Sequence, residues 1–183
     1  SQTGDFIFDL NDKDGSFGPH GVIGGMTGSG KSEVLRTFIL SLAATHHPYD
    51  LNFALIDFKG GSAFNDLAQL PHTVGIITDI ETHFSYAERV ILALTGEIEA
   101  RKRILEEARV TFQFNKSHID DYRQLVVKRP LPRLVIIFDE FAAFKTRHPE
   151  ESRKLIAIAQ QGRSLGVHLI LATQNVEMAV DPE

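Results

Sequence analysis

The sequence has 183 residues, of which 43% are apolar and 23% are charged, and its formal net charge is −5. This size and composition favour one globular domain with a sizeable core. The absence of cysteine excludes disulfides and cysteine-based zinc sites. No apolar run in the sequence approaches the ~20 residues of a membrane-spanning helix. The acidic balance argues against a large non-specific nucleic-acid surface.

Apolar strands alternate with amphipathic helices along the chain, and this pattern predicts an α/β fold with a mostly parallel sheet. The expected strands cover residues 6–10, 21–24, 51–57, 73–78, 134–138 and 167–172, with a turn at 11–15. The expected helices cover residues 31–45, 82–108, 119–126 and 149–161. No repeat or linker interrupts the pattern, so the sequence predicts a single domain over residues 1–183.

A glycine-rich stretch joins the strand at 21–24 to the helix at 31–45. It matches the phosphate-loop pattern G-x-x-x-x-G-K-[ST] at each fixed position, and its residues are Gly25, Met26, Thr27, Gly28, Ser29, Gly30, Lys31 and Ser32. Glycines let backbone N–H groups close around phosphates, and the following helix N-terminus favours an anion. We expect this loop to bind ATP with Mg²⁺, Lys31 reaching the β- and γ-phosphates and Ser32 ligating the metal. The alternative is a glycine-rich turn with an incidental lysine.

Two acids, Asp139 and Glu140, follow the apolar strand at 134–138. In P-loop ATPases the strand beside the phosphate loop ends in an aspartate that supports Mg²⁺, and Asp139 fits this role. A glutamate directly after it can orient or deprotonate the attacking water, so we expect Glu140 to be the catalytic base. Asp57 also ends a strand but lacks an adjacent acid, which favours Asp139. The alternative is a solvent-facing acid pair.

The strand at 167–172 is followed by Thr173 and Gln174, at the edge of the sheet where the phosphates are expected. An amide at that edge can hydrogen-bond the γ-phosphate or the attacking water. Alone, Gln174 is better explained by an ordinary strand-to-loop transition, but beside the other motifs it indicates a nucleotide sensor. The helix at 82–108 carries a basic run at residues 101–103, and we interpret this run as a solvated face of the helix.

Five further stretches are more specific than these motifs. They are GPHG at 18–21, TGSGKSE at 27–33, DFKGG at 57–61, LPHTVG at 70–75 and GRSLGVH at 162–168. Together they resemble the FtsK/SpoIIIE branch of the additional-strand P-loop ATPases over about residues 6–174. Within that branch the chain is most similar to the first ATPase domain of the type VII secretion ATPases EccC and EssC. The secretion branch favours a glutamate at the position of Glu33, so the resemblance adds Glu33 to the nucleotide site.

The resemblance implies a RecA-like core, with the C-terminal part of the domain missing from this sequence. It implies that the domain belongs to a longer, membrane-anchored chain with three such domains, which acts as a hexameric ring. ATP hydrolysis would then power export of small WXG-type proteins at the cytoplasmic face of the bacterial membrane. The implied partners are the other ATPase domains of the chain and neighbouring subunits, while membrane contact would use parts absent here and DNA is not expected.

Ring ATPases place an arginine of a neighbouring subunit against the γ-phosphate. The resemblance offers Arg89, which matches the secretion branch, and Arg163, which matches the DNA pumps; each is equally explained as a surface ion-pair residue. The sequence departs from the family after Gln174, where residues 175–177 replace the usual Arg/Lys-Pro. Three functions stay open: a motor for protein export, a DNA translocase of the same fold, and a nucleotide-binding module with little hydrolysis.

Overall fold

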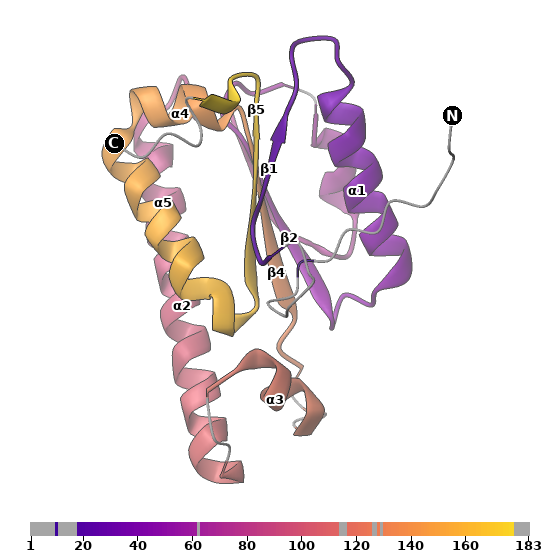
Figure 1. Ribbon diagram of the computed structural model, residues 1–183, viewed down its shortest axis with the longest axis vertical. Coiled ribbons are helices and arrows are strands. Elements are labelled where there is room, and N and C mark those ends of the chain that lie inside the picture. The colour runs from indigo at the N-terminus through magenta and orange to yellow at the C-terminus, as the bar shows by residue number, and fades with distance from the viewer. Residues whose placement is uncertain are drawn as a thin grey trace.

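The structure is a computed structural model that describes residues 10, 18–61, 63–113, 117–125, 128 and 130–177. Apart from Leu10, the strand expected at 6–10 and the turn at 11–15 lie outside the described residues. Within them, five parallel strands form one sheet (Figure 1). These strands are β1 (Gly21–Gly24), β2 (Leu51–Asp57), β3 (Thr73–Thr78), β4 (Arg133–Asp139) and β5 (Val167–Thr173).

The helices agree with the expected ones in place, with small shifts at their ends. They are α1 (Lys31–Thr45), α2 (Phe84–Phe112), α3 (Ile119–Leu125), α4 (Phe141–Arg147) and α5 (Pro149–Gly162), with short 3₁₀ turns η1 (Asn65–Gln69) and η2 (Arg163–Leu165). Helix α2 runs past residue 108 until Gln113, whose left-handed backbone (φ 59°) ends it. Helix α4 was not expected, because seven residues are too few to show a helical period.

The strand order is β1-β5-β4-β2-β3, so β5 lies between β1 and β4. This corrects one expectation, since the strand that ends in Asp139 is not the direct neighbour of the strand that leads into the phosphate loop. All neighbouring strands pair in parallel, so their C-terminal ends share one edge of the sheet, here called the carboxyl edge. At that edge Asp57 of β2 lies opposite Asp139 of β4.

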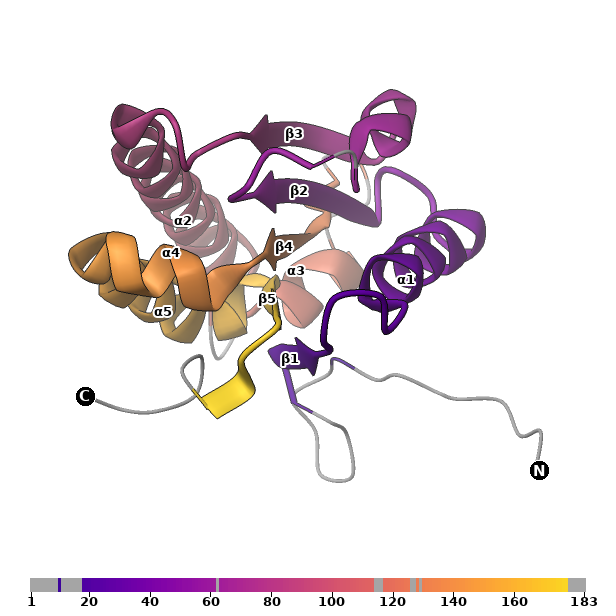
Figure 2. The same cartoon turned by 90° about the horizontal axis from the view of Figure 1, so that it is seen from above.

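Helices cover both faces of the sheet, with α1 on one face and α2, α4 and α5 on the other (Figure 2). The strands are therefore buried on both sides, which explains why β4 and β5 read as continuous apolar runs. Leu35 and Ile39 attach α1 to one face of the sheet, and Val90 and Ile98 belong to the cluster that attaches α2 to the other. Among the described residues, the helices are either too short or too polar to cross a bilayer.

The basic run on α2 is not the uniformly solvated face that the sequence indicated. Arg101 is only 3% exposed and donates a 2.9 Å hydrogen bond to the carbonyl of Leu165 in η2. It also forms a 2.7 Å ion pair with Glu97, one turn earlier. Lys102, in contrast, lies at the surface and pairs with Glu99. Arg101 thus fixes α2 to the turn that precedes β5, a long-range contact that a local charge pattern does not reveal.

Candidate nucleotide site

The phosphate loop leaves β1 at the carboxyl edge and enters α1 at Lys31. The backbone N–H of Gly25 donates to the carbonyl of Thr173 at 3.1 Å, which ties the start of the loop to β5. Gly28 and Gly30 have left-handed backbones, with φ of 79° and 87°. A Cβ on either would meet no atom within 4 Å, so these two positions favour glycine for its backbone freedom and not for lack of space.

Helix α1 begins directly after Gly30, which caps it without a side-chain hydrogen bond. The N–H groups of its first turn lack partners within the helix, and the helix dipole places partial positive charge there. Ser32 lies half-buried in this turn, while Glu33 and Met26 are exposed. The helix start therefore provides an anion-binding surface with a hydroxyl beside it.

Lys31 reaches across the carboxyl edge to the acids at the end of β4. Its Nζ forms an ion pair with Asp139 Oδ1 and lies 3.3 Å from Glu140 Oε1. Asp139 Oδ1 also accepts a 2.9 Å hydrogen bond from the backbone N–H of Glu140. All three side chains are at most one-tenth exposed, so these charges interact with little solvent screening.

Glu140 occupies a left-handed backbone conformation, with φ of 59°, between β4 and α4. Such a conformation is uncommon for a residue with a side chain and is concentrated at functional sites. Its Oε1 accepts a 2.6 Å hydrogen bond from the side-chain amide of Gln174, and its Oε2 lies 3.6 Å from Lys59 Nζ. The tight turn thus directs this carboxylate toward the ends of β5 and β2.

Gln174 joins the phosphate loop to Glu140. Its Oε1 accepts a 3.0 Å hydrogen bond from Thr27 Oγ1, while its Nε2 donates to Glu140. The residues after it, where the sequence departs from the family, pack on the strand that leads into the loop. A Cβ on Gly24 would lie 2.2 Å from Val176 Cγ2, so any other residue at this position would displace the Val176 side chain.

Asp57, the alternative acid, is engaged in the loop that follows its own strand. It is 3% exposed, and its Oδ1 accepts hydrogen bonds from the backbone N–H groups of Lys59 at 3.1 Å and Gly60 at 3.2 Å. Burial, and next the charge of Asp139, raise the pKa of Asp57, against the lowering effect of these hydrogen bonds. In the structure Lys31 pairs with Asp139. Asp57 instead holds the turn that follows its own strand.

The donor set at this edge fits Mg-ATP. Magnesium prefers hard oxygen ligands; Ser32, which follows Lys31 in the chain, offers a hydroxyl, and Asp139, which pairs with Lys31, offers a carboxylate. The backbone N–H groups of the loop and of the first turn of α1 would hold the phosphates. These are the residue types that the phosphate chemistry needs, gathered from β4, β5 and the β1–α1 loop.

The two candidate arginines lie near opposite edges of the sheet. Arg89 lies in the second turn of α2, after the carboxyl end of β3, and its guanidinium carbon is 5.7 Å from the centre of the Tyr86 ring. Arg163 begins η2, four residues before β5 starts, and therefore lies near the opposite edge from the phosphate loop. The length of β5, seven residues of about 3.3 Å each, separates Arg163 from the phosphate loop of its own chain. Arg163 is therefore too far away to contact a phosphate bound there.

One contact of this site was not foreseen from the sequence. Lys59 lies in the DFKGG stretch but received no predicted role, and the structure brings it to Glu140. The available signal was its position directly after a strand that ends at the carboxyl edge.

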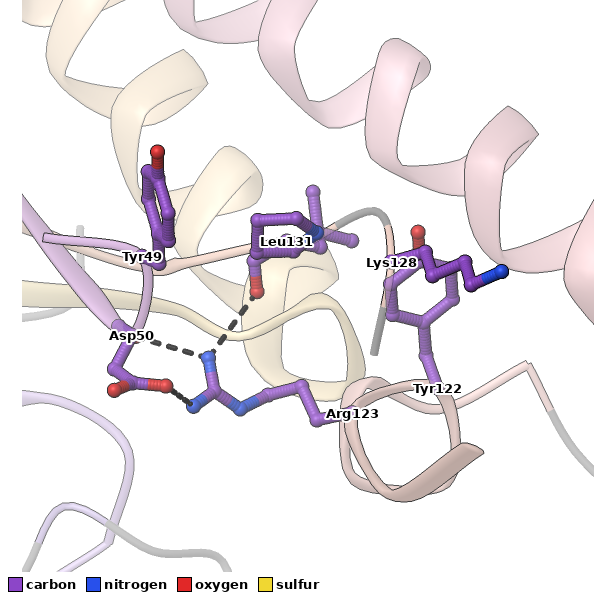
Figure 3. Close-up of a pocket in the computed structure, with 7 residues that line it drawn as sticks. Tyr49, Asp50, Tyr122, Arg123, Lys128 and Leu131 are labelled. Atoms are coloured by element: carbon purple, nitrogen blue, oxygen red, sulfur yellow. Dashed lines mark hydrogen bonds and ion pairs between the residues drawn. The ribbon is translucent and has the colours of Figure 1, made fainter. Parts of the chain in front are cut away.

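A separate cavity of about 320 Å³ lies at the other end of the strands (Figure 3). Its lining residues are Tyr49, Asp50, Tyr122, Arg123, Lys128, Pro130 and Leu131. Arg123 is occupied there by an ion pair with Asp50 and by a 3.3 Å hydrogen bond to the carbonyl of Leu131. Parallel sheets bind ligands at the carboxyl ends of their strands, so this cavity is not the nucleotide site.

Comparison with known sequences gives a consistent result. The chain matches the model of the FtsK/SpoIIIE family over residues 5–178. It is 40% identical over 181 residues to the ESX secretion system protein EccC of Geobacillus thermodenitrificans. It is 42% identical over 183 residues to the type VII secretion system protein EssC of Staphylococcus aureus. These alignments cover 97% and 98% of this chain but only 12% of each relative.

Solved structures of related proteins share the fold. The cytoplasmic domain of the type VII secretion ATPase EccC of Thermomonospora curvata superimposes with a TM-score of 0.77 at 41% identity, covering 86% of this chain and 18% of that one. ATPases 2 and 3 of EssC from Geobacillus thermodenitrificans give 0.67 at 33% identity, covering 84% of this chain and 28% of that one. These likenesses confirm the expected P-loop fold, and with the matched family model they show that the chain belongs to the FtsK/SpoIIIE family.

Proposed function

We propose that the chain is an ATP-binding and ATP-hydrolysing motor domain of a longer protein that powers type VII, or ESX, protein secretion. The observation that carries the proposal is the connected cluster of Lys31, Asp139, Glu140 and Gln174 at the mouth of the phosphate loop. Relatives that are about 40% identical over nearly the whole chain bear the names of ESX and type VII secretion proteins.

In the proposed mechanism, the backbone N–H groups of residues 25–32 and of the first turn of α1 bind the phosphates. Lys31 exchanges its ion pairs with Asp139 and Glu140 for β- and γ-phosphate oxygens. This exchange frees Asp139, which together with Ser32 would hold Mg²⁺, and the metal would supply positive charge against the phosphates. The exchange also frees Glu140 to align water for in-line attack, while Gln174 hydrogen-bonds the γ-phosphate.

A neighbouring subunit would complete the site with an arginine, Arg89 or Arg163. Arg163 lies near the edge of the sheet remote from its own loop, which suits a residue that acts on another subunit. Hydrolysis would then change the geometry between domains of a hexameric ring at the cytoplasmic face of the bacterial membrane. The substrates in this proposal are small WXG-type proteins, engaged by the full-length chain.

Two other functions compete with this one. A DNA translocase of the same family would use the same nucleotide chemistry, but the net charge of −5 disfavours a DNA-binding surface on this domain. A regulatory nucleotide-binding module would need no base, yet Glu140 is present and held in place beside Gln174. Stimulation of turnover by duplex DNA, and not by a WXG-type protein, would favour the translocase.

The deciding experiment measures ATP turnover by the chain as a function of its own concentration. Missing arginine fingers cost about 10³–10⁵-fold in related P-loop enzymes, so an isolated subunit should turn over slowly. A specific rate that rises with concentration and vanishes in Lys31→Ala supports a site shared between subunits. Turnover that is equal in Lys31→Ala and the parent contradicts the proposed function.

A further inference from the structure

The carboxylate of Glu140 is contacted by three side chains in this structure. Lys31 Nζ lies 3.3 Å from Oε1, the Gln174 amide donates to Oε1 at 2.6 Å, and Lys59 Nζ lies 3.6 Å from Oε2. One oxygen is therefore shared by the phosphate-loop lysine and the sensor amide, and the other faces the loop after β2. The two oxygens are held from different directions.

Two of these three contacts compete with nucleotide. In the proposed mechanism Lys31 turns to the β- and γ-phosphates, and Gln174 turns to the γ-phosphate. A carboxylate that loses both donors is free to rotate, and general-base catalysis requires it to stay within hydrogen-bond reach of the water. Of the three contacts named above, the one from Lys59 is not claimed by any proposed interaction with ATP.

The backbone around Lys59 is fixed on both sides. Before it, Phe58 is buried, stacks edge-on against Phe144 with ring centres 5.9 Å apart, and accepts a 2.9 Å backbone hydrogen bond from Glu81. After it, Gly60 has a φ of 74°, and a Cβ there would lie 2.9 Å from the Cβ of Asp79. The starting point of the Lys59 side chain is thus set by the fold.

Asp57 holds the turn itself. Its Oδ1 accepts hydrogen bonds from the N–H groups of Lys59 at 3.1 Å and Gly60 at 3.2 Å. Asp57 also lies opposite Asp139 in the β2–β4 register, so this turn lies beside the end of β4, which Glu140 directly follows. The backbone N–H of Phe58 donates to the carbonyl of Asp139 at 3.4 Å, which links the two strand ends directly.

We propose that Lys59 is a positioning residue for Glu140, and this inference rests on the proposed ATPase function. When Lys31 and Gln174 engage the phosphates, Lys59 keeps a positive charge at Oε2. That charge attracts the carboxylate and holds it in the direction set by the turn after β2. Lys59 acts through Glu140 and does not itself touch ATP.

The side chain of Lys59 is 47% exposed, which makes the test practical. Truncation leaves no buried cavity, so Lys59→Ala should fold and unfold like the parent. Lys102 is a matched control, because its side chain is 43% exposed and its ion pair with Glu99 lies on α2, away from the nucleotide site. Lys59→Arg restores the charge at the same position and tests for rescue.

The experiment measures kcat and KM for ATP in the full-length protein. For Lys59→Ala we expect kcat to fall about 10-fold, less than the 10²–10⁴-fold of losing a general base, with KM changed less than about 2-fold. Lys59→Arg should recover most of the rate, and Lys102→Ala should match the parent.

Other results would overturn the inference. If Lys59→Ala has the kcat of an active parent, the contact is an ordinary surface ion pair. If KM rises while kcat is unchanged, Lys59 binds the phosphates instead of positioning Glu140. A parent whose turnover does not depend on Lys31 contradicts the proposed function, and the inference about Lys59 with it. The Lys31→Ala control therefore separates the two failures.

Discussion

The side-chain amide of Gln174 donates a 2.6 Å hydrogen bond to Glu140 Oε1, across the ends of β5 and β4. The orientation of this amide is fixed from its other side, because Gln174 Oε1 accepts a hydrogen bond from Thr27 Oγ1 at 3.0 Å. One amide thus connects the phosphate loop to the expected base. This arrangement gives Gln174 a role that a substitution can test.

Replacing the amide of Gln174 by a carboxylate, in Gln174→Glu, places two acids against each other. Like charges at hydrogen-bond distance repel, and a donor aimed at the reacting groups is lost. We expect kcat to fall about 10²-fold while ATP binding is retained. The control is Gln161→Glu, at an exposed position of α5, which should leave kcat unchanged. Parent-like turnover in Gln174→Glu would exclude the sensor role.

Glu140→Gln tests the base itself. The amide preserves the shape of the side chain but cannot accept a proton from water, so we expect kcat to fall about 10²–10⁴-fold. ATP binding should persist, because Lys31 and the loop backbone remain. Turnover and nucleotide affinity are measured on the same preparation, with Glu150→Gln on the surface of α5 as the control. A variant as fast as the parent removes Glu140 from the mechanism.

Mixing variants tests the proposal that Arg89 or Arg163 acts between subunits. Lys31→Ala cannot use its own site but still offers its arginines, whereas Arg89→Ala or Arg163→Ala offers an intact site without one finger. We expect the variant of the true finger to be nearly inactive alone and to regain turnover when mixed with Lys31→Ala. An arginine variant that is fully active alone is not the finger. If neither mixture regains activity, no arginine of this pair acts in trans.

Because Arg101 is buried, we expect its substitution to lower the stability of the protein more than substitution of an exposed neighbour does. Arg101→Ala leaves the carbonyl of Leu165 without its 2.9 Å donor and removes packing between α2 and η2. The loss should lower the unfolding free energy by about 2 kcal/mol, measured by urea denaturation. Arg103→Ala, at an exposed position of the same helix, should change it by less than about 0.5 kcal/mol. Equal effects of the two variants would contradict the buried role of Arg101.

His168 of β5 makes stability depend on pH. Burial, and next the charge of Arg133, lower its pKa from 6.5 to about 4. Its Nδ1 is 3.0 Å from the carbonyl of Pro19, which makes Nδ1 the donor, and among the described residues Nε2 has no hydrogen-bond partner. A proton on Nε2 would therefore be buried without an acceptor.

Because the folded-state pKa lies below the unfolded one, the unfolded chain binds the proton first, and stability falls as pH falls from about 6.5 to 4. The full loss attributable to His168 is about 3 kcal/mol. His168→Asn keeps a donor for Pro19 and should flatten the curve of unfolding free energy against pH between 6.5 and 5. Burial also lowers the pKa of His148, so part of the slope should remain. The exposed His47→Asn should retain the parent's slope; an equal slope in His168→Asn contradicts the assignment.

Much of the molecule follows from local sequence pattern. The bounds expected for β1, β2, β3 and α1 are those of the structure. Each of these elements shows a complete apolar pattern in the sequence and has a local start or stop signal. The phosphate loop was predictable for a similar reason, since its glycines, lysine and serine are consecutive residues whose spacing fixes their geometry. Family membership also followed from short, consecutive stretches, and the matched family model confirms it.

Tertiary structure alone decided the relationships between distant segments. The placement of β5 between β1 and β4 separates the strand of Asp139 from that of the phosphate loop, and strand order is not encoded in any single window. The burial of Arg101 depends on a carbonyl 64 residues away, so its charge pattern on α2 indicated the wrong environment. The contact of Lys59 with Glu140 likewise joins two strand ends through the parallel register of β2 and β4. Sequence specifies the chemistry of each segment, whereas packing of the sheet decides which of these groups meet.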